Sequence, residues 1–348
     1  MVLSYRHAFH AGNIADVLKH VVVTTVAGRL SARAKAERTP LSYVETHAGI
    51  GLYDLTSEQA RKRNEHKTGI AQLLASPAFR RTANAAALRP YLECIQSYNV
   101  ETSATRWYPG SPAYVAPYLS KDSRVVLCEL HPSDVETLRE NSKDIFPDHQ
   151  NVQIQPQCGF QFLRKEAWHC KSAEERKKRV AAASGSGELT MCLIDPPYEH
   201  PSEYQMIVQG LFDATKAFQQ GTHILWYPLL RDNISEAVTK KSRALIKAKS
   251  ALKRCLLGNT IYEIELDIVG RIPEENSSGG DEPGTSGSQK EPRSKRHSSL
   301  RGCGLILVNP ENSVVDHLEA DVLPAIVEAY PSLSGDDSRR TRMSSQWI

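Results

Sequence analysis

The stretch Met191-Cys192-Leu193-Ile194-Asp195-Pro196-Pro197-Tyr198 decides the fold. Its first four residues are apolar, which predicts a buried strand of a parallel sheet, and the two prolines end that strand because they lack backbone donors. Asp195 is therefore expected at the carboxyl end of a strand. Ligands of open α/β sheets bind along that edge, so the stretch also predicts the position of a functional site.

The turn at this strand end suits the methylation of a planar amino group. The 6-amino group of adenine is a weak nucleophile because its lone pair is delocalised into the ring. The Asp195 carboxylate and the Pro196 carbonyl can accept its two N–H groups and localise that pair, while Pro197 keeps the turn rigid. Tyr198 is expected to stack on an extruded base. A surface Asp in an ordinary Pro-Pro turn is the alternative.

Composition sets the size and class of the protein. With 348 residues, 40% of them hydrophobic, the chain can form one large domain or two ordinary ones. A formal charge of +3 neither requires nor excludes a nucleic-acid partner. Two basic clusters, at 61–67 and 171–179, either contact phosphates or are solvated helix faces.

Cysteine usage and hydropathy indicate the compartment. Seven cysteines without a Cys-x-x-Cys pair argue against zinc and against a disulfide framework, so we expect no metal and a reducing compartment. The sequence has no apolar run of about 18 residues and no apolar signal segment, which supports neither membrane insertion nor secretion. We therefore expect a cytoplasmic monomer, with an organelle not excluded.

The N-terminal half begins with a helix and a glycine turn. Asn13 should cap a helix that runs to about Leu30, with Lys19 and His20 off its apolar stripe. A lone histidine in such a place is usually a half-buried surface residue. Residues 41–45 read as the first strand, and the turn at 46–53 contains His47 and two glycines, Gly49 and Gly51, that let backbone approach a ligand. A Gly-x-Gly without a third glycine disfavours NAD.

The remaining elements predict an α/β fold, a Rossmann-like doubly wound sheet with an antiparallel closing strand and a small helical insertion. We expect the insertion at 54–106, between an N-terminal part (1–53) and the remainder of the domain (107–348). Trp107 to Pro112 should form a rigid loop leading into a helix. Further strands are expected at 124–130, 152–155, 191–195 and 222–228, and an antiparallel pair at 262–269 and 303–309, joined by a disordered loop at 271–300. Glu129 ends the second strand, where an acid commonly grips ribose hydroxyls.

With these motifs in place, the chain resembles the RlmJ family, bacterial 23S ribosomal RNA adenine-N6 methyltransferases. The resemblance runs in family order through Leu3–His7, Phe9–Asn13, Ala15–His20, Thr46–Gly49, Tyr108–Pro112, Glu129–Asp134, Gly159–Gln161, Ile194–Glu199, Leu225–Pro228 and Val308–Pro310.

The resemblance implies a cofactor, a substrate and a set of site residues. The cofactor is S-adenosylmethionine, held by residues that match Lys19, His20, His47, Ser111, Glu129, Cys158 and Gly159. Asp195, within Asp195-Pro196-Pro197-Tyr198, matches the catalytic acid, and Tyr5 matches a residue associated with the 23S-type ribosomal RNA substrate. The inserted helices would contact RNA. This chain departs from the family at Cys158, where the family has Asp, and in its long loop near residues 274–299.

Three alternatives stay open at this point. Asp-Pro-Pro-Tyr turns also serve DNA adenine and RNA guanine methyltransferases, because several planar amino groups fit them. From a different class, the chain could be a catalytically silent RNA-binding factor of ribosome assembly, for which Cys158 is the one hint. An intact Asp195-Pro196-Pro197-Tyr198 favours an enzyme.

Overall fold

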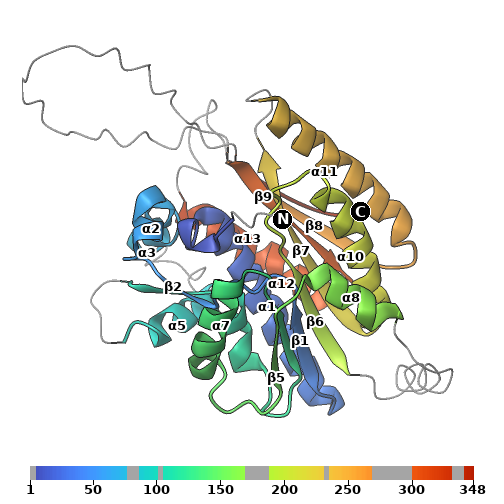
Figure 1. The fold of residues 1–348 in the computed structure, drawn as a ribbon, viewed down its shortest axis with the longest axis horizontal. Helices are drawn as coiled ribbons and strands as arrows, with labels where there is room; N and C mark the ends of the chain where they lie inside the picture. The colour runs from blue at the N-terminus through green and yellow to red at the C-terminus, as the bar shows by residue number, and fades with distance from the viewer. Residues whose placement is uncertain are drawn as a thin grey trace, which may run out of the picture.

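The computed structural model describes residues 5–76, 86–100, 105–168, 188–230, 235–268, 300–330 and 341–348. Its centre is an eight-stranded sheet with the order β10-β8-β9-β7-β6-β1-β4-β5 (Figure 1). Five strands are parallel: β1 (Leu41–Glu45), β4 (Val125–Cys128), β5 (Val152–Gln155), β6 (Leu189–Ile194) and β7 (Gly221–Leu230). β8 (Ile261–Ile268), β9 (Leu300–Val308) and β10 (Thr341–Trp347) extend the sheet by antiparallel pairing. The predicted α/β class is confirmed.

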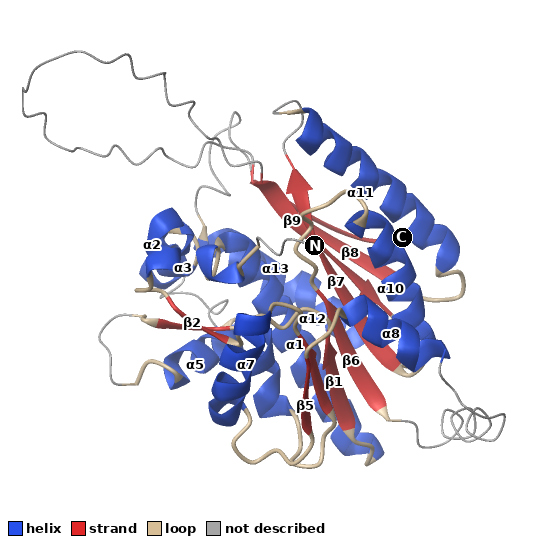
Figure 2. Cartoon of the chain, in the orientation of Figure 1, coloured by secondary structure: helices blue, strands red, loops and turns tan. Residues whose placement is uncertain are grey.

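Helices cover both faces of the sheet because its strands alternate their apolar side chains between two cores (Figure 2). In β6, Met191 and Leu193 join one core, whereas Cys192 and Ile194 join the other. The first core also holds residues of α1 (Ile14–Glu37), α5 (Arg89–Ser97), α6 (Ser111–Val115), α7 (Pro132–Ile145), α12 (Asn312–His317) and α13 (Leu323–Ala329). The second holds residues of α8 (Gly159–Trp168), α10 (Glu203–Ala217) and α11 (Glu236–Cys255).

A second, two-stranded sheet frames the predicted insertion. β2 (Leu52–Asp54) pairs antiparallel with β3 (Trp107–Pro109), whereas a rigid loop was predicted from Trp107 to Pro112; the helix expected after it is α6, which begins at Ser111. The strand forms because Tyr53 and Tyr108, which are paired in register, are both buried. Between them lie α2 (Glu58–Arg63), α3 (Ile70–Ala75) and α5. The division of the chain at residues 53 and 106 stays a prediction. Short turns of helix complete the fold at His7–Phe9 (η1), Glu65–Lys67 (η2), Ala116–Tyr118 (η4) and Leu318–Val322 (η5, of π type).

Two element boundaries differ from the expectation. The Asn13 side chain caps α1 by accepting from the Asp16 amide, as predicted, but the helix continues to Glu37 rather than about Leu30. Residues 31–37 are mostly good helix formers and include an Arg33–Glu37 ion pair one turn apart, so nothing ends the helix earlier. β10 was not predicted. The loop expected at 271–300 lies outside the described residues except for Leu300, where β9 begins.

The register of the parallel strands brings the predicted site together. Glu45, the last residue of β1, pairs with Leu127 of β4 on one side and Leu193 of β6 on the other. The segments that follow these strands therefore meet at one edge. They carry His47, Glu129 and Asp195.

Candidate active site

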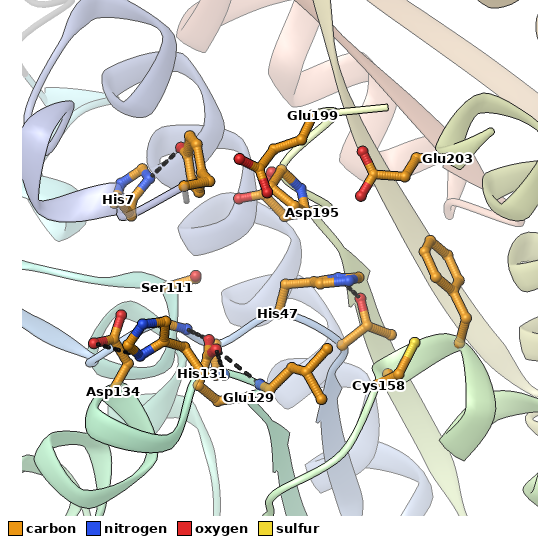
Figure 3. Close-up of a pocket in the computed structure, with 18 of the residues that line it drawn as sticks. His7, His47, Ser111, Glu129, His131, Asp134, Cys158, Asp195, Glu199 and Glu203 are labelled. Atoms are coloured by element: carbon orange, nitrogen blue, oxygen red, sulfur yellow. Dashed lines mark hydrogen bonds and ion pairs between the residues drawn. The ribbon is translucent and has the colours of Figure 1, made fainter. Parts of the chain in front are cut away.

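A cavity of 540 Å³ opens at this edge, a size typical of ligand pockets. Ten of the predicted site residues line it: Tyr5, Lys19, His20, His47, Ser111, Glu129, Cys158, Gly159, Asp195 and Pro197. In Figure 3, Asp195 lies on one side of the pocket and Glu129 on another, with Ser111 and His47 between them. The cavity can therefore hold an elongated ligand that reaches from one carboxylate toward the other.

A buried lysine fixes Asp195. The Lys19 Nζ atom lies 2.7 Å from Oδ2 of Asp195 and 3.0 Å from Oδ1 of Asp16. Lys19 is 3% exposed. Burial by itself would lower the pKa of Lys19, but the two carboxylates outweigh it and hold that pKa well above its usual value. Among the described residues, Oδ1 of Asp195 accepts no hydrogen bond, so one carboxylate oxygen is held and the other is open to a ligand.

The network continues from Asp16 to the N-terminus. Oδ2 of Asp16 lies 2.8 Å from Nε2 of His7 and accepts from the amide of Gly12, and Nδ1 of His7 lies 3.0 Å from the Tyr5 hydroxyl. Burial would raise the pKa of Asp16, yet His7 and Lys19 together hold it well below its usual range. Sequence reasoning missed Asp16. Asp16 lies within the motif Ala15–His20, and its three-residue spacing to Lys19 is also typical of surface ion pairs.

His20 is buried, so the expectation of a half-buried surface histidine from its residue pattern is wrong. It is 1% exposed because its ring stacks on Tyr114 of α6, with ring centroids 4.7 Å apart, and lies against Tyr108 of β3. Its Nδ1 lies 2.9 Å from the Tyr108 hydroxyl, and Nε2 has no partner among the described residues. Burial, then the Lys19 charge, hold the pKa of His20 well below its usual value. A neutral ring with an unsatisfied nitrogen beside a cavity is a ready ligand contact.

Ser111 is oriented by a second residue that sequence reasoning missed. Glu45 accepts hydrogen bonds from the Ser111 hydroxyl and, at 2.8 Å, from the Tyr43 hydroxyl. It is fully buried at the end of β1, and burial raises its pKa to about 7. The residue was assigned only to the strand, since nothing in the local pattern marks it as a partner of Ser111.

Glu129 is held by three backbone amides. It accepts from Gly49 at 3.0 Å through Oε2, and from Leu130 and His131 through Oε1. Burial nonetheless raises its pKa. Gly49 has φ +59°, and a Cβ there would lie 2.2 Å from the Tyr53 hydroxyl oxygen, so the turn requires glycine.

The opposite wall is formed by the turns after β1 and β5. A Cβ on Gly159 would lie 2.2 Å from the Thr46 carbonyl oxygen, so only glycine allows this close approach. Nδ1 of His47 lies 2.7 Å from the Thr46 hydroxyl, and burial lowers the pKa of His47 to about 4. Cys158 precedes α8, and its carbonyl accepts from the amides of Gln161 and Phe162.

Pro196 and Tyr198 are not among the lining residues. The Tyr198 side chain is 4% exposed, and its hydroxyl donates to the Trp226 carbonyl at 2.6 Å. The residue has φ +54°, a costly conformation for tyrosine, and its carbonyl accepts from Lys241 at 2.8 Å. In the structure, Tyr198 therefore anchors the turn beneath the pocket instead of presenting its ring to it.

These features fit a bound nucleoside-containing cofactor. His20 offers an unsatisfied buried nitrogen beside the cavity, and Oε2 of Glu129, which accepts from one amide, has a lone pair left for a ribose hydroxyl. No group of three His, Cys, Asp or Glu placed to hold a metal ion occurs among the described residues. No helix in the same residues is long and apolar enough to cross a membrane.

The sheet order and the Asp-Pro-Pro-Tyr turn define a methyltransferase of the Rossmann-like class. A family model described as "Ribosomal RNA large subunit methyltransferase D, RlmJ" matches residues 38–254, and the chain belongs to this RlmJ family. Membership implies S-adenosylmethionine as the methyl donor.

Two relatives and one solved structure are similar over most of the chain. "Ribosomal RNA large subunit methyltransferase J" of Haemophilus influenzae is 35% identical over 66% of this chain and 71% of its own length. The protein of the same name from Escherichia coli K12 is 35% identical over 68% of this chain and 74% of its own. A crystal structure of a Legionella pneumophila protein superimposes with a TM-score of 0.64, covering 97% of both chains at 23% identity, a likeness of fold.

Proposed function

We propose that this enzyme transfers a methyl group from S-adenosylmethionine to the exocyclic 6-amino group of an adenine in 23S-type large-subunit ribosomal RNA. The names of its relatives support an RNA substrate from the large subunit. One observation of this structure supports the chemistry most: a strand-end carboxylate, Asp195, with one oxygen bound to a buried lysine and the other open to the pocket.

The bound cofactor supplies an electrophilic methyl group. The chain's own residues orient the amine that attacks it. Asp195 accepts one N–H of the adenine amino group through Oδ1, which orients the nitrogen. The Pro196 carbonyl, although Pro196 is not among the lining residues of the pocket, is the proposed acceptor of the other N–H. Lys19 keeps Asp195 from rotating away, since its ammonium binds Oδ2 at 2.7 Å. The nitrogen becomes acidic once methylated, and its proton passes to Asp195 or to water.

The other side of the pocket fits the cofactor. Oε2 of Glu129, which accepts from the Gly49 amide alone, would accept a ribose hydroxyl, and Gly159, which lines the pocket, would lie against the adenosine. His20, Ser111 and His47 are proposed contacts of the methionine portion and its surroundings. Cys158 stands where the family has the Asp that would accept from the cofactor's adenine.

The N-terminal residues are proposed to contact the RNA. Tyr5 is 37% exposed, lines the pocket, and stacks on His10 with ring centroids 5.6 Å apart. Its hydroxyl is linked through His7 and Asp16 to Lys19. A base entering the pocket would thus meet a ring whose position depends on the same network that holds Asp195. Tyr198 acts on the base indirectly, by fixing the turn.

A split between binding and turnover tests the role of Asp195. Asp195→Ala should abolish methylation and leave S-adenosylmethionine binding within a few-fold, because Asp195 orients the amine and does not hold the cofactor. Calorimetry and a turnover assay measure the two quantities on the same preparation. Cofactor binding lost together with activity would make Asp195 a cofactor or folding residue.

A further inference from the structure

Helix α11 carries an unusual concentration of positive charge. Its 20 residues include seven Lys or Arg and one Glu, a formal charge of +6, against +3 for the whole chain. All other residues together thus sum to −3. Such a local excess is the electrostatic signature of a surface that binds a polyanion.

Two of the seven basic residues serve the fold. Lys241 donates to the Tyr198 carbonyl, and Lys249 forms ion pairs with Glu263 and Glu265 at 2.7 and 2.8 Å. Both are half-buried, so their charges are already used within the protein.

The exposed residues form one stripe: Lys240, Arg243, Lys247 and Arg254. Their spacing of three, four and seven residues keeps them on the same face of the helix over about 21 Å. Lys240 pairs with Glu236 at 2.8 Å, but the other three have no acidic partner among the described residues. Lys253 is exposed beside them.

The first turns of α11 lie against the catalytic turn. Lys241 donates to the carbonyl of Tyr198 in Asp195-Pro196-Pro197-Tyr198, and Lys240, one residue before it, lies about 100° round the helix on the exposed stripe. The opposite, apolar face of α11 packs into the core through Leu245, Ala248 and Leu252. A membrane-surface helix needs a free apolar face, so this helix is suited to a soluble polyanion.

We propose that this stripe of α11, which we call the α11 stripe, binds the phosphate backbone of the RNA substrate beside the target nucleotide. The proposal rests on the proposed function for the identity of the polyanion. An RNA strand whose target adenine enters the pocket above Tyr198 then continues past Lys240 and Arg243 first, and along Lys247 and Arg254 next.

Salt dependence of RNA binding tests the α11 stripe. The probe is an in vitro transcript of large-subunit ribosomal RNA, free of protein, titrated at 50 to 200 mM KCl. Arg243→Gln/Lys247→Gln removes two proposed phosphate contacts and should reduce the slope of log K against log salt by about 1.5. Its affinity deficit relative to wild type should then be roughly eightfold larger at 50 than at 200 mM.

The matched control is Arg29→Gln/Lys35→Gln. It changes net charge by the same amount at two exposed positions of α1 and should leave the slope unchanged. S-adenosylmethionine affinity and helical circular dichroism should match wild type in both variants. The KM for RNA should rise in the stripe variant alone, with kcat retained.

Equal slopes for the stripe variant and wild type, or an equal fall in the control, would overturn the proposal. The binding readout also separates it from the proposed function. If the salt slope depends on the α11 stripe but no adenine is methylated, the stripe binds RNA and the proposed reaction is wrong. If adenine is methylated but the slope is unchanged in the stripe variant, the reaction is supported and the proposal for the stripe is wrong.

Discussion

Lys19→Met removes the ammonium between two carboxylates in the interior. Asp16 is 4% exposed, and the oxygens of Asp16 and Asp195 that bind Nζ lie less than about 6 Å apart, since each is within 3.0 Å of that atom. Taking one partner out of a buried ion pair costs about 3–5 kcal/mol, because the remaining charge is uncompensated. We expect the free energy of unfolding to fall by this amount.

Activity should fall for a separate reason. Asp195 loses a charge-assisted hydrogen bond of about 1.5–3 kcal/mol that fixes its orientation toward the amine, which predicts a fall in kcat of roughly ten- to a hundredfold. Lys35→Met is the matched control: the same substitution at an exposed position of the same helix should change stability by less than about 0.5 kcal/mol and leave kcat unchanged.

The double variant Asp16→Asn/Lys19→Met separates the two effects. It also removes the charge of Asp16, one of the two carboxylates left without a partner, so stability should recover in part. The kcat should stay low because Asp195 still lacks the hydrogen bond from Lys19. Urea unfolding and single-turnover methylation measure the two quantities. Recovery of kcat along with stability would refute the reasoning, since Lys19 would then act only through folding. A single Lys19→Met variant with wild-type kcat would refute it too.

Two further predictions concern the cofactor side. Cys158→Asp should tighten S-adenosylmethionine binding roughly ten- to a hundredfold in calorimetry, because a thiol is a poor acceptor and a charged hydrogen bond contributes about 1.5–3 kcal/mol. The control Cys158→Ser should not tighten binding, although serine, like aspartate, can cap the N-terminus of α8. Unchanged or weaker binding by the Asp variant would mean that another acceptor already serves the cofactor. For Glu45, whose pKa burial raises to about 7, the folded state favours the protonated form, so the contribution of Glu45 to stability should decline as pH rises from about 4.5 through 7. Relative to wild type, Glu45→Gln should gain up to about 3 kcal/mol across that window in urea unfolding, and a difference independent of pH would contradict this assignment.

The strands that position the site were predictable because their signal is local. The run from Met191 to Ile194 is apolar and ends in two prolines, and β6 ends at Ile194 as expected. By contrast, β10 has the sequence Thr-Arg-Met-Ser-Ser-Gln-Trp, with no regular apolar alternation, and becomes a strand by pairing with the edge of β8. The pairing of β10 with β8 is determined by the tertiary fold, and the residues of β10 alone do not predict it.

The site residues also differ in whether the sequence could predict them. Glu129 and Asp195 were found because each ends a predicted strand. Asp16 and Glu45 were missed because their roles depend on residues distant in sequence. The Lys19–Asp195 contact joins positions 176 residues apart, and Ser111 reaches Glu45 across 66. Sequence patterns report neighbours along a helix or strand, but not which buried charge will face another.

The most direct test of the proposed reaction is nucleoside analysis after incubation with labelled S-adenosylmethionine. Protein-free large-subunit ribosomal RNA, duplex DNA and a peptide are offered in parallel, and each product is digested and separated by chromatography and mass spectrometry. The geometry at Asp195 predicts label in N6-methyladenosine from the RNA alone, and none with the Asp195→Ala enzyme. Label in a methylated guanosine, in DNA or in the peptide, or an undiminished yield from Asp195→Ala, would contradict it.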